Sequence, residues 1–218
     1  MEDVAAQLRA MGRRALVVPT DLRDSDAITV AARRTLDEFG RVDSVVNNSG
    51  VGGPSAPLWE IDLAEWEETF AVNVTGTYLI CKAFLPSMIR RRGGSIIVIG
   101  SVTGKRPLLN RTPYAASKLA LVGLVRTLAH EVGLHGVRVN LISPGGVEGA
   151  RIDWVIKEQA QGQGITEEQA RAQFADGSPL KRLVAPQDVA NAVVFLASDL
   201  SAGVTGEDMN VSAGLAMY

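Results

Sequence analysis

SIIVIGS, residues 95–101, is the stretch that decides the fold of this 218-residue chain. Its centre is a continuous run of β-branched apolar residues, which is typical of a strand covered on both faces. Three similar runs, Ala15–Pro19, Val42–Val46 and Arg138–Ser143, and a shorter one, Met209–Val211, are separated by longer helical patterns. Short buried strands that alternate with helices predict an α/β fold with a parallel sheet, in which ligands bind beyond the carboxyl ends of the strands.

The helical patterns have recognisable ends. Asp24 is expected to cap a helix that ends at Gly40, and Asp62 is expected to begin a long helix toward Met88. Pro113 suits the first turn of a further helix. Between residues 149 and 182 the composition becomes polar and helix-forming without a strand. We interpret this segment as a substrate lid over the ligand crevice, inserted into a single domain that spans residues 1–218.

The composition is that of an ordinary globular protein. Hydrophobic residues make up 46%, charged residues 21%, and the net charge is -2, so no polyanion such as a nucleic acid is indicated as a partner. No segment has the length and apolarity of a membrane span, and the N-terminus lacks the apolar core of a signal peptide, so a cytoplasmic location is expected. The single cysteine, Cys81, allows no intrachain disulfide, and no metal cluster is indicated.

Two stretches place a lysine four residues after a tyrosine: YLICK, residues 78–82, and YAASK, residues 114–118. This spacing puts both side chains on one helix face, where an ammonium group favours the phenolate and so suits acid/base chemistry. In YLICK the intervening residues are apolar, which favours a core or interface position. In YAASK they are small, which lets a ligand approach. Ser101, at the end of the strand before YAASK, has a hydroxyl that can donate to a carbonyl oxygen.

The sequence resembles the short-chain dehydrogenase/reductase family over essentially its whole length. Ser101, YAASK and NLISPGGV (residues 140–147) match the Ser, YxASK and NxxxPGxV elements of that family in order and spacing. NNSG (47–50) resembles its NNAG element, and FAVNVTG (70–76) resembles the segment with its catalytic Asn. VVPTDL (17–22) matches the segment with an acidic residue near the adenine ring.

The resemblance implies a Rossmann-like doubly wound sheet and NAD(P)-dependent interconversion of a small-molecule secondary alcohol and a ketone. It implies that Tyr114 transfers the proton, that Lys118 assists it and binds the nicotinamide ribose, that Ser101 orients the carbonyl, and that Asn73 holds a relay water. The implied cofactor-binding residues are Asp21, Leu22, Asn48, Gly50, Tyr114, Lys118, Pro144 and Val147. The choice between NAD and NADP is not readable from these residues.

The family's opening TGxxxGxG turn and its first βαβ strands are not found in these 218 residues. We interpret this as an N-terminal truncation, with Ala15–Pro19 expected as the third strand of the family order. The alternative is a non-catalytic relative that cannot bind cofactor and acts through subunit contacts. Epimerases and dehydratases with the same Tyr and Lys chemistry remain a third possibility. The resemblance also implies a homotetramer or homodimer in which the Asp62–Met88 and Pro113–His130 helices pack against their copies.

Overall fold

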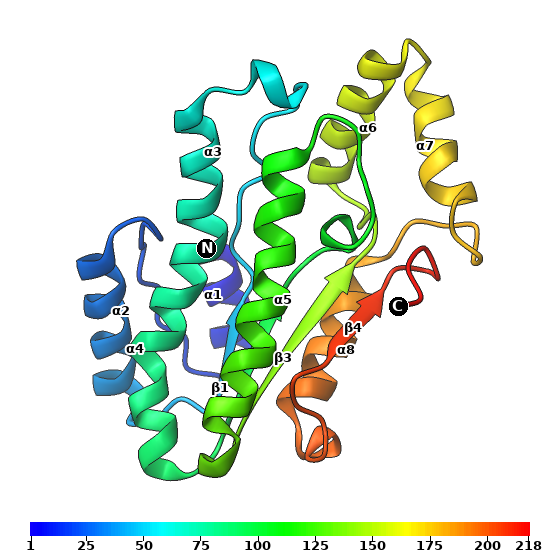
Figure 1. The fold of residues 1–218 in the computed structure, drawn as a ribbon. Coiled ribbons are helices and arrows are strands. Elements are labelled where there is room, and N and C mark those ends of the chain that lie inside the picture. The colour runs from blue at the N-terminus through cyan, green and yellow to red at the C-terminus, as the bar shows by residue number, and fades with distance from the viewer.

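The structure is a computed structural model that describes residues 1–218, and its centre is a four-stranded parallel sheet (Figure 1). The strands are paired in the order β1-β2-β3-β4, so four of the five expected strands are present and the prediction of a parallel α/β sheet is confirmed. Their bounds are Ser44–Asn47 for β1, Gly94–Ile99 for β2, Val137–Pro144 for β3 and Asp208–Val211 for β4.

Eight α-helices accompany the sheet. They are α1 (Glu2–Ala10), α2 (Ser25–Phe39), α3 (Leu63–Phe70), α4 (Gly76–Arg91), α5 (Thr112–Val132), α6 (Ala150–Gln163), α7 (Glu167–Asp176) and α8 (Pro186–Ala197). None of them combines the length and apolar character that crossing a bilayer requires.

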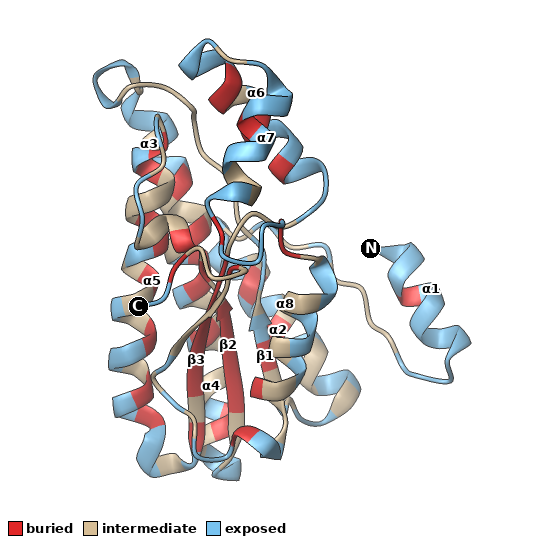
Figure 2. Cartoon of the chain, turned by 90° about the vertical axis from the view of Figure 1, so that its right-hand side faces the viewer, coloured by how far each residue is buried: buried red, intermediate tan, exposed pale blue.

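Residues of β2 point alternately to the two faces of the sheet and are buried on both. Ile96 and Val98 pack with buried residues of α4 and α5, whereas Ile97 packs with Ile142 of β3 and Leu196 of α8. In Figure 2 the strands form a buried layer between helices. A strand with water on neither face loses nothing by being apolar at every position, which explains the uninterrupted run SIIVI.

Helix ends follow the local signals, with one exception. The Asp24 carboxylate accepts the N–H groups of Asp26 and Ala27, and Gly40 ends the helix in the left-handed conformation at φ 77°. The single helix expected from Asp62 to Met88 is not formed, because a five-residue π-helical turn, Ala71–Thr75, separates α3 from α4. Such turns often occur at functional sites.

The strand expected at Ala15–Pro19 is also absent, since residues 13–20 form neither strand nor helix. A strand is stabilised by hydrogen bonds to a neighbouring backbone, and residues 14–20 make no backbone hydrogen bond to any strand. In Figure 2 helix α1 lies apart from the sheet at the end of this segment. Strand β1 is therefore an edge of the sheet, and Val46, which faces away from the buried Val45, is 43% exposed.

The segment expected as a lid forms helices α6 and α7, which Figure 1 shows beyond the carboxyl end of β3. These helices share an apolar core of their own, made by Ile152, Val155, Ile156, Ala160, Ala170 and Leu183. This separate core holds α6 and α7 together, and other residues of α6 line a cavity.

Candidate active site

A cavity of about 520 Å³ lies where β2 and β3 end, below helix α6. This is the position at which doubly wound sheets bind ligands. Its lining includes six of the residues singled out from the sequence, namely Asn48, Ser101, Tyr114, Lys118, Pro144 and Val147. The folding of the chain thus brings together residues from the ends of three strands, β1, β2 and β3, and from helix α5.

Tyr114 and Lys118 lie on the first turns of α5, which begins with Pro113 in its first turn. The Lys118 ammonium nitrogen lies 5.8 Å from the centre of the Tyr114 ring and donates a hydrogen bond to the Ile99 carbonyl at 2.9 Å. Burial, and next the positive charge of Arg151, lowers the pKa of Lys118 to about 8. The side chain is 95% buried, so its charge is held in place close to the tyrosine.

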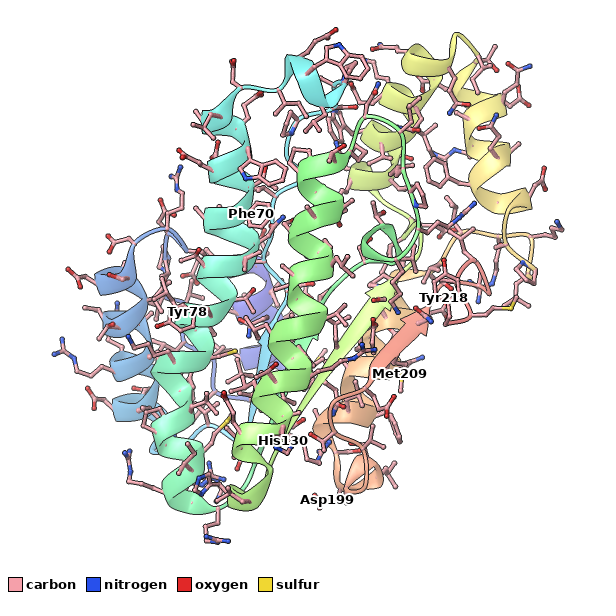
Figure 3. The ribbon with its side chains drawn as sticks, viewed as in Figure 1. Phe70, Tyr78, His130, Asp199, Met209 and Tyr218 are labelled. Atoms are coloured by element: carbon pink, nitrogen blue, oxygen red, sulfur yellow. The ribbon has the colours of Figure 1, made fainter.

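The second tyrosine and lysine pair has almost the same internal geometry. The Lys82 nitrogen lies 5.7 Å from the centre of the Tyr78 ring, but this pair is on α4 and lines a separate apolar groove between α4 and α5. Figure 3 labels Tyr78. Tyr78 is 47% exposed. A spacing of four residues therefore produces the pair in both helices, and the position relative to the strand ends distinguishes the two.

Ser101 follows β2 directly and has its side chain oriented by the backbone. Its hydroxyl oxygen accepts the Thr103 N–H at 3.1 Å as the cap of a short 3₁₀ turn, Val102–Gly104. Because the oxygen serves as an acceptor there, the hydroxyl hydrogen is left to donate to a ligand in the cavity.

Asn73 lies in the π-helical turn and is 99% buried. Its amide oxygen accepts the Val51 N–H at 2.9 Å, and its amide nitrogen donates to the Val51 carbonyl and to the Ser117 hydroxyl, both at 3.0 Å. It is not among the cavity-lining residues, but a Cβ added to Gly50 would lie 2.9 Å from its oxygen and 3.5 Å from the Lys118 nitrogen. Asn73 and Lys118 therefore flank Gly50.

Asp21 and Leu22 do not join the cavity. The Asp21 carboxylate accepts hydrogen bonds from Arg23, which lower its pKa to about 2. Leu22 packs against Gly76 at the start of α4, where an added Cβ would meet the Leu22 side chain at 2.9 Å. Neither residue is among those that line the cavity.

Sequence reasoning missed two arginines beside the tyrosine. The Arg111 and Arg151 guanidinium carbons lie 5.3 Å and 5.4 Å from the centre of the Tyr114 ring. Arg111 also lies 4.8 Å from the Trp154 ring on α6. The one available signal was the charge of Arg111 three residues before Tyr114, and burial of that charge cannot be read from such spacing.

The residues at the Tyr114 end of the cavity fit a nicotinamide nucleoside. After its bond to Ile99, the Lys118 ammonium group has two N–H donors left for ribose hydroxyls. A Cβ added to Gly145 would lie 3.0 Å from the Ser212 backbone. The Gly145 backbone itself, rather than a side chain, therefore lines the cavity at this position. The glycine-rich turn that holds the pyrophosphate in dinucleotide-binding folds is not found in residues 1–218.

Comparison with known proteins decides the family. A family model described as Enoyl-(Acyl carrier protein) reductase matches residues 1–216. The short chain dehydrogenase/reductase astE of Aspergillus oryzae is 35% identical over 218 residues, which cover 99% of this chain and 81% of the relative. The chain belongs to the short-chain dehydrogenase/reductase family. Another relative of this short-chain dehydrogenase/reductase is the cis-4-hydroxycyclohexanecarboxylate dehydrogenase of Sinomonas cyclohexanicum, 34% identical over 213 residues, which cover 98% of this chain and 81% of the relative.

Solved structures agree with this assignment. An NAD⁺-bound xylitol dehydrogenase superposes with a TM-score of 0.94 at 26% identity, covering 98% of this chain and 84% of that one. An actinorhodin polyketide ketoreductase with NADPH gives the same TM-score at 30% identity, covering 100% of this chain and 84% of that one. The short-chain dehydrogenase/reductase fold is thus shown, as is oxidoreduction with a nicotinamide cofactor at a general level, while the two neighbours differ in the cofactor they hold.

Proposed function

We propose that this chain catalyses the interconversion of a secondary alcohol and a ketone, with Tyr114 as general acid and base. The observation that carries the proposal is the convergence of Ser101, Tyr114 and Lys118 on one cavity at the strand ends. When bound, NAD or NADP would supply the acceptor or donor of the hydride. The chain's own residues would then transfer the proton of the substrate hydroxyl and stabilise the negative charge on the substrate oxygen.

In oxidation, the Tyr114 phenolate takes the proton of the substrate hydroxyl as the carbinol C–H bond breaks and the C=O bond forms. In reduction, the Tyr114 hydroxyl returns that proton to the carbonyl oxygen. The Lys118 ammonium stabilises the phenolate by its charge, which it keeps at neutral pH because its pKa is about 8. The Ser101 hydroxyl donates to the same substrate oxygen and stabilises its negative charge.

The test is the pair of substitutions Tyr114→Phe and Tyr78→Phe. Both remove one hydroxyl from a tyrosine that has a lysine one turn away, at nearly equal ring-to-ammonium distances. Y114F is expected to lower kcat by about 100-fold or more, the usual contribution of a positioned acid/base, and Y78F is expected to leave kcat unchanged. Turnover of Y114F at the wild-type rate would refute the assignment.

We propose that the Lys118 ammonium and the backbone around Gly145 bind the nicotinamide end of the cofactor. Asn48 would lie along its adenosine side. Asp21 and Leu22 remain part of the proposal only as adenine contacts outside the cavity. Titration of the chain with NADH and with NADPH, followed by cofactor fluorescence, tests binding and separates the two cofactors.

The second candidate is a non-catalytic relative that acts through subunit contacts. It is favoured by the absence of a TGxxxGxG turn in these residues and by the free edge of β1. Saturable binding of either reduced cofactor to the 218-residue chain would contradict this candidate. Absence of binding together with a folded chain would support it.

We also propose a homodimer or homotetramer, formed in the cytoplasm through α4 and α5. The supporting feature is the groove of about 540 Å³ between these helices, lined by Tyr78, Cys81, Lys82, Leu85, Pro86, Ile89, Leu124, Thr127, Leu128 and Glu131. Light scattering is expected to show more than one chain per particle, and Leu124→Arg is expected to dissociate it. A monomeric wild-type protein would contradict this assembly.

A further inference from the structure

The candidate active site contains an excess of positive charge. Four cations line the cavity, Arg106, Arg111, Lys118 and Arg151, against the single carboxylate of Glu148. None of these four cations takes part in a salt bridge, although seven other arginines do: Arg9, Arg14, Arg23, Arg41, Arg91, Arg171 and Arg182. Cations gathered in a concave and partly dry site raise the local concentration of an anionic ligand.

Arg111 is the residue among them that requires an explanation, because it is 98% buried. Its guanidinium group donates to the Gly52 carbonyl at 2.6 Å and to the Pro54 carbonyl at 3.4 Å. Of the five N–H groups of an arginine, three therefore have no acceptor, and the buried Nε is one of them. A buried cation with free donors and no counter-ion is costly, so its presence indicates that an anion completes the site.

Burial is the largest effect on the pKa of Arg111 and lowers it; the positive charge of Arg151 also lowers it, whereas negative charge on Tyr114 or Glu158 raises it. Glu158 does so from beyond salt-bridge distance, so it does not neutralise the guanidinium. Arginine stays protonated even when its pKa falls, so the group cannot escape the cost of burial by losing its proton.

The surroundings hold Arg111 rigidly beside the reacting position. Its guanidinium carbon lies 5.3 Å from the centre of the Tyr114 ring and 4.8 Å from that of the Trp154 ring, so the group packs against both. The guanidinium lies so close to Gly52 that a Cβ added to this glycine would be 2.9 Å from one of its terminal nitrogens. The Arg111 side chain is therefore already in close contact with the loop that contains Gly52. Arg151, exposed at the start of α6, approaches the same Tyr114 ring from helix α6 and donates to the Gly50 carbonyl at 3.3 Å.

We propose that the substrate is an anionic alcohol or ketone whose carboxylate or phosphate group is bound by Arg111, with Arg151 contributing a second positive charge. Both anions present paired oxygen atoms that match the fork of a guanidinium. This inference rests on the proposed function, since it names the substrate class for the same cavity. In this inference Arg111 binds the anionic group of the substrate, and Tyr114, which both arginines approach, transfers the proton.

The test is calorimetric titration of the wild-type chain, without cofactor, with cyclohexanecarboxylate, cyclohexyl phosphate and the neutral cyclohexanecarboxamide. One or both anions are expected to bind at least 10-fold more tightly than the amide, and the better of the two identifies the group. In Arg111→Gln the anion is expected to bind about 10- to 100-fold more weakly, the usual contribution of a charge-assisted hydrogen bond. The control is Arg126→Gln, which removes one exposed positive charge from α5, the helix that Arg111 precedes, and is expected to change nothing.

Several outcomes would overturn the inference. Equal binding of the amide and the anions by the wild type would do so without any variant, and so would equal weakening of all three ligands in R111Q, which indicates a purely structural arginine. If R111Q does not fold, Arg111→Lys keeps the charge without the fork and is expected to weaken anion binding while preserving the Gly52 contact. Tight binding of inorganic pyrophosphate with no binding of the two cyclohexyl anions would assign Arg111 to the cofactor instead.

This design separates the inference from the proposed function. Turnover of a neutral ketone by a chain that binds no organic anion would leave the oxidoreductase assignment in place and remove the anion site. Anion binding by a chain that turns over no alcohol or ketone would do the reverse.

Discussion

Asn73 is joined to Val51 by two hydrogen bonds, one to its N–H at 2.9 Å and one from the amide to its carbonyl at 3.0 Å. The side chain thus pairs with the backbone as a neighbouring strand would, in the loop that follows β1. Its third bond, to Ser117 at 3.0 Å, ties that loop to α5 between Tyr114 and Lys118. One buried amide therefore holds the relative positions of the β1 loop and helix α5.

Replacing Asn73 by alanine is expected to destabilise the protein by about 2 kcal/mol, because buried polar groups of Val51 and Ser117 lose their partners. The loss should appear as a lower midpoint in urea denaturation. The variant Asn73→Asp keeps the acceptor for the Val51 N–H, loses the donor to the Val51 carbonyl and Ser117, and adds the cost of a buried carboxylate, so it is expected to be destabilised as well. A wild-type midpoint for N73A would contradict the bracing role.

Gly50→Ala is expected to disturb the contact between the loop after β1, Asn73 and helix α5. The new methyl group would lie 2.9 Å from the Asn73 oxygen and 3.5 Å from the Lys118 nitrogen, so the Asn73 amide must shift. We expect a lower kcat together with a lower urea midpoint. The matched control is Gly133→Ala, at a helical φ of -57° with nothing within 4 Å of the added Cβ, and it should leave both quantities close to wild type.

Lys118→Met is expected to change how stability depends on pH. In the folded chain burial holds the Lys118 pKa near 8, below its ordinary value of 10.5. Between these two values the unfolded chain binds more protons at Lys118 than the folded chain, so wild-type stability gains with rising pH. Below pH 8 the burial penalty is fully present, and K118M is expected to be more stable than wild type by on the order of 1 kcal/mol.

The measurement for this prediction is the difference in free energy of unfolding between K118M and wild type, taken from urea curves at several pH values. The difference should be constant below about pH 8 and should move in favour of wild type from there toward pH 10.5. A difference that does not vary with pH would show that Lys118 titrates equally in the folded and unfolded chains.

Lys105 and Asp208 form a largely buried salt bridge of 2.7 Å that links the loop after β2 to β4. Lys105 also donates to Asn210 at 2.6 Å, and the hydroxyl of Tyr218, seen beyond β4 in Figure 3, donates to the Lys105 carbonyl at 3.2 Å. Lys105→Met leaves the Asp208 charge buried without its partner and is expected to destabilise the protein by about 3 kcal/mol.

The double variant Lys105→Met, Asp208→Asn removes the unpaired charge and is expected to recover part of that stability. Its urea midpoint should lie between those of K105M and wild type. If the double variant is no more stable than K105M, the cost of the single change has another origin than the isolated carboxylate.

Much of the fold could be predicted because its signals are local. Apolar runs indicated all four strands, and Asp24 with Gly40 marked both ends of α2, since caps and burial patterns depend on residues close in sequence. The strand expected at Ala15–Pro19 was wrong for the opposite reason. Its residues suit a strand, but pairing requires a second backbone, which no local pattern supplies.

At the candidate site, the sequence alone determined the Tyr114 and Lys118 pair, the position of Ser101 at a strand end, and the family. It could not distinguish by geometry YAASK from YLICK, whose pairs have the same internal distance. Only the tertiary structure decided that Asp21 lies away from the cavity and that Arg111 is buried against Tyr114 without a counter-ion. Charge and burial in a site depend on which distant segments converge there, and that convergence is a property of the packed chain rather than of any one stretch.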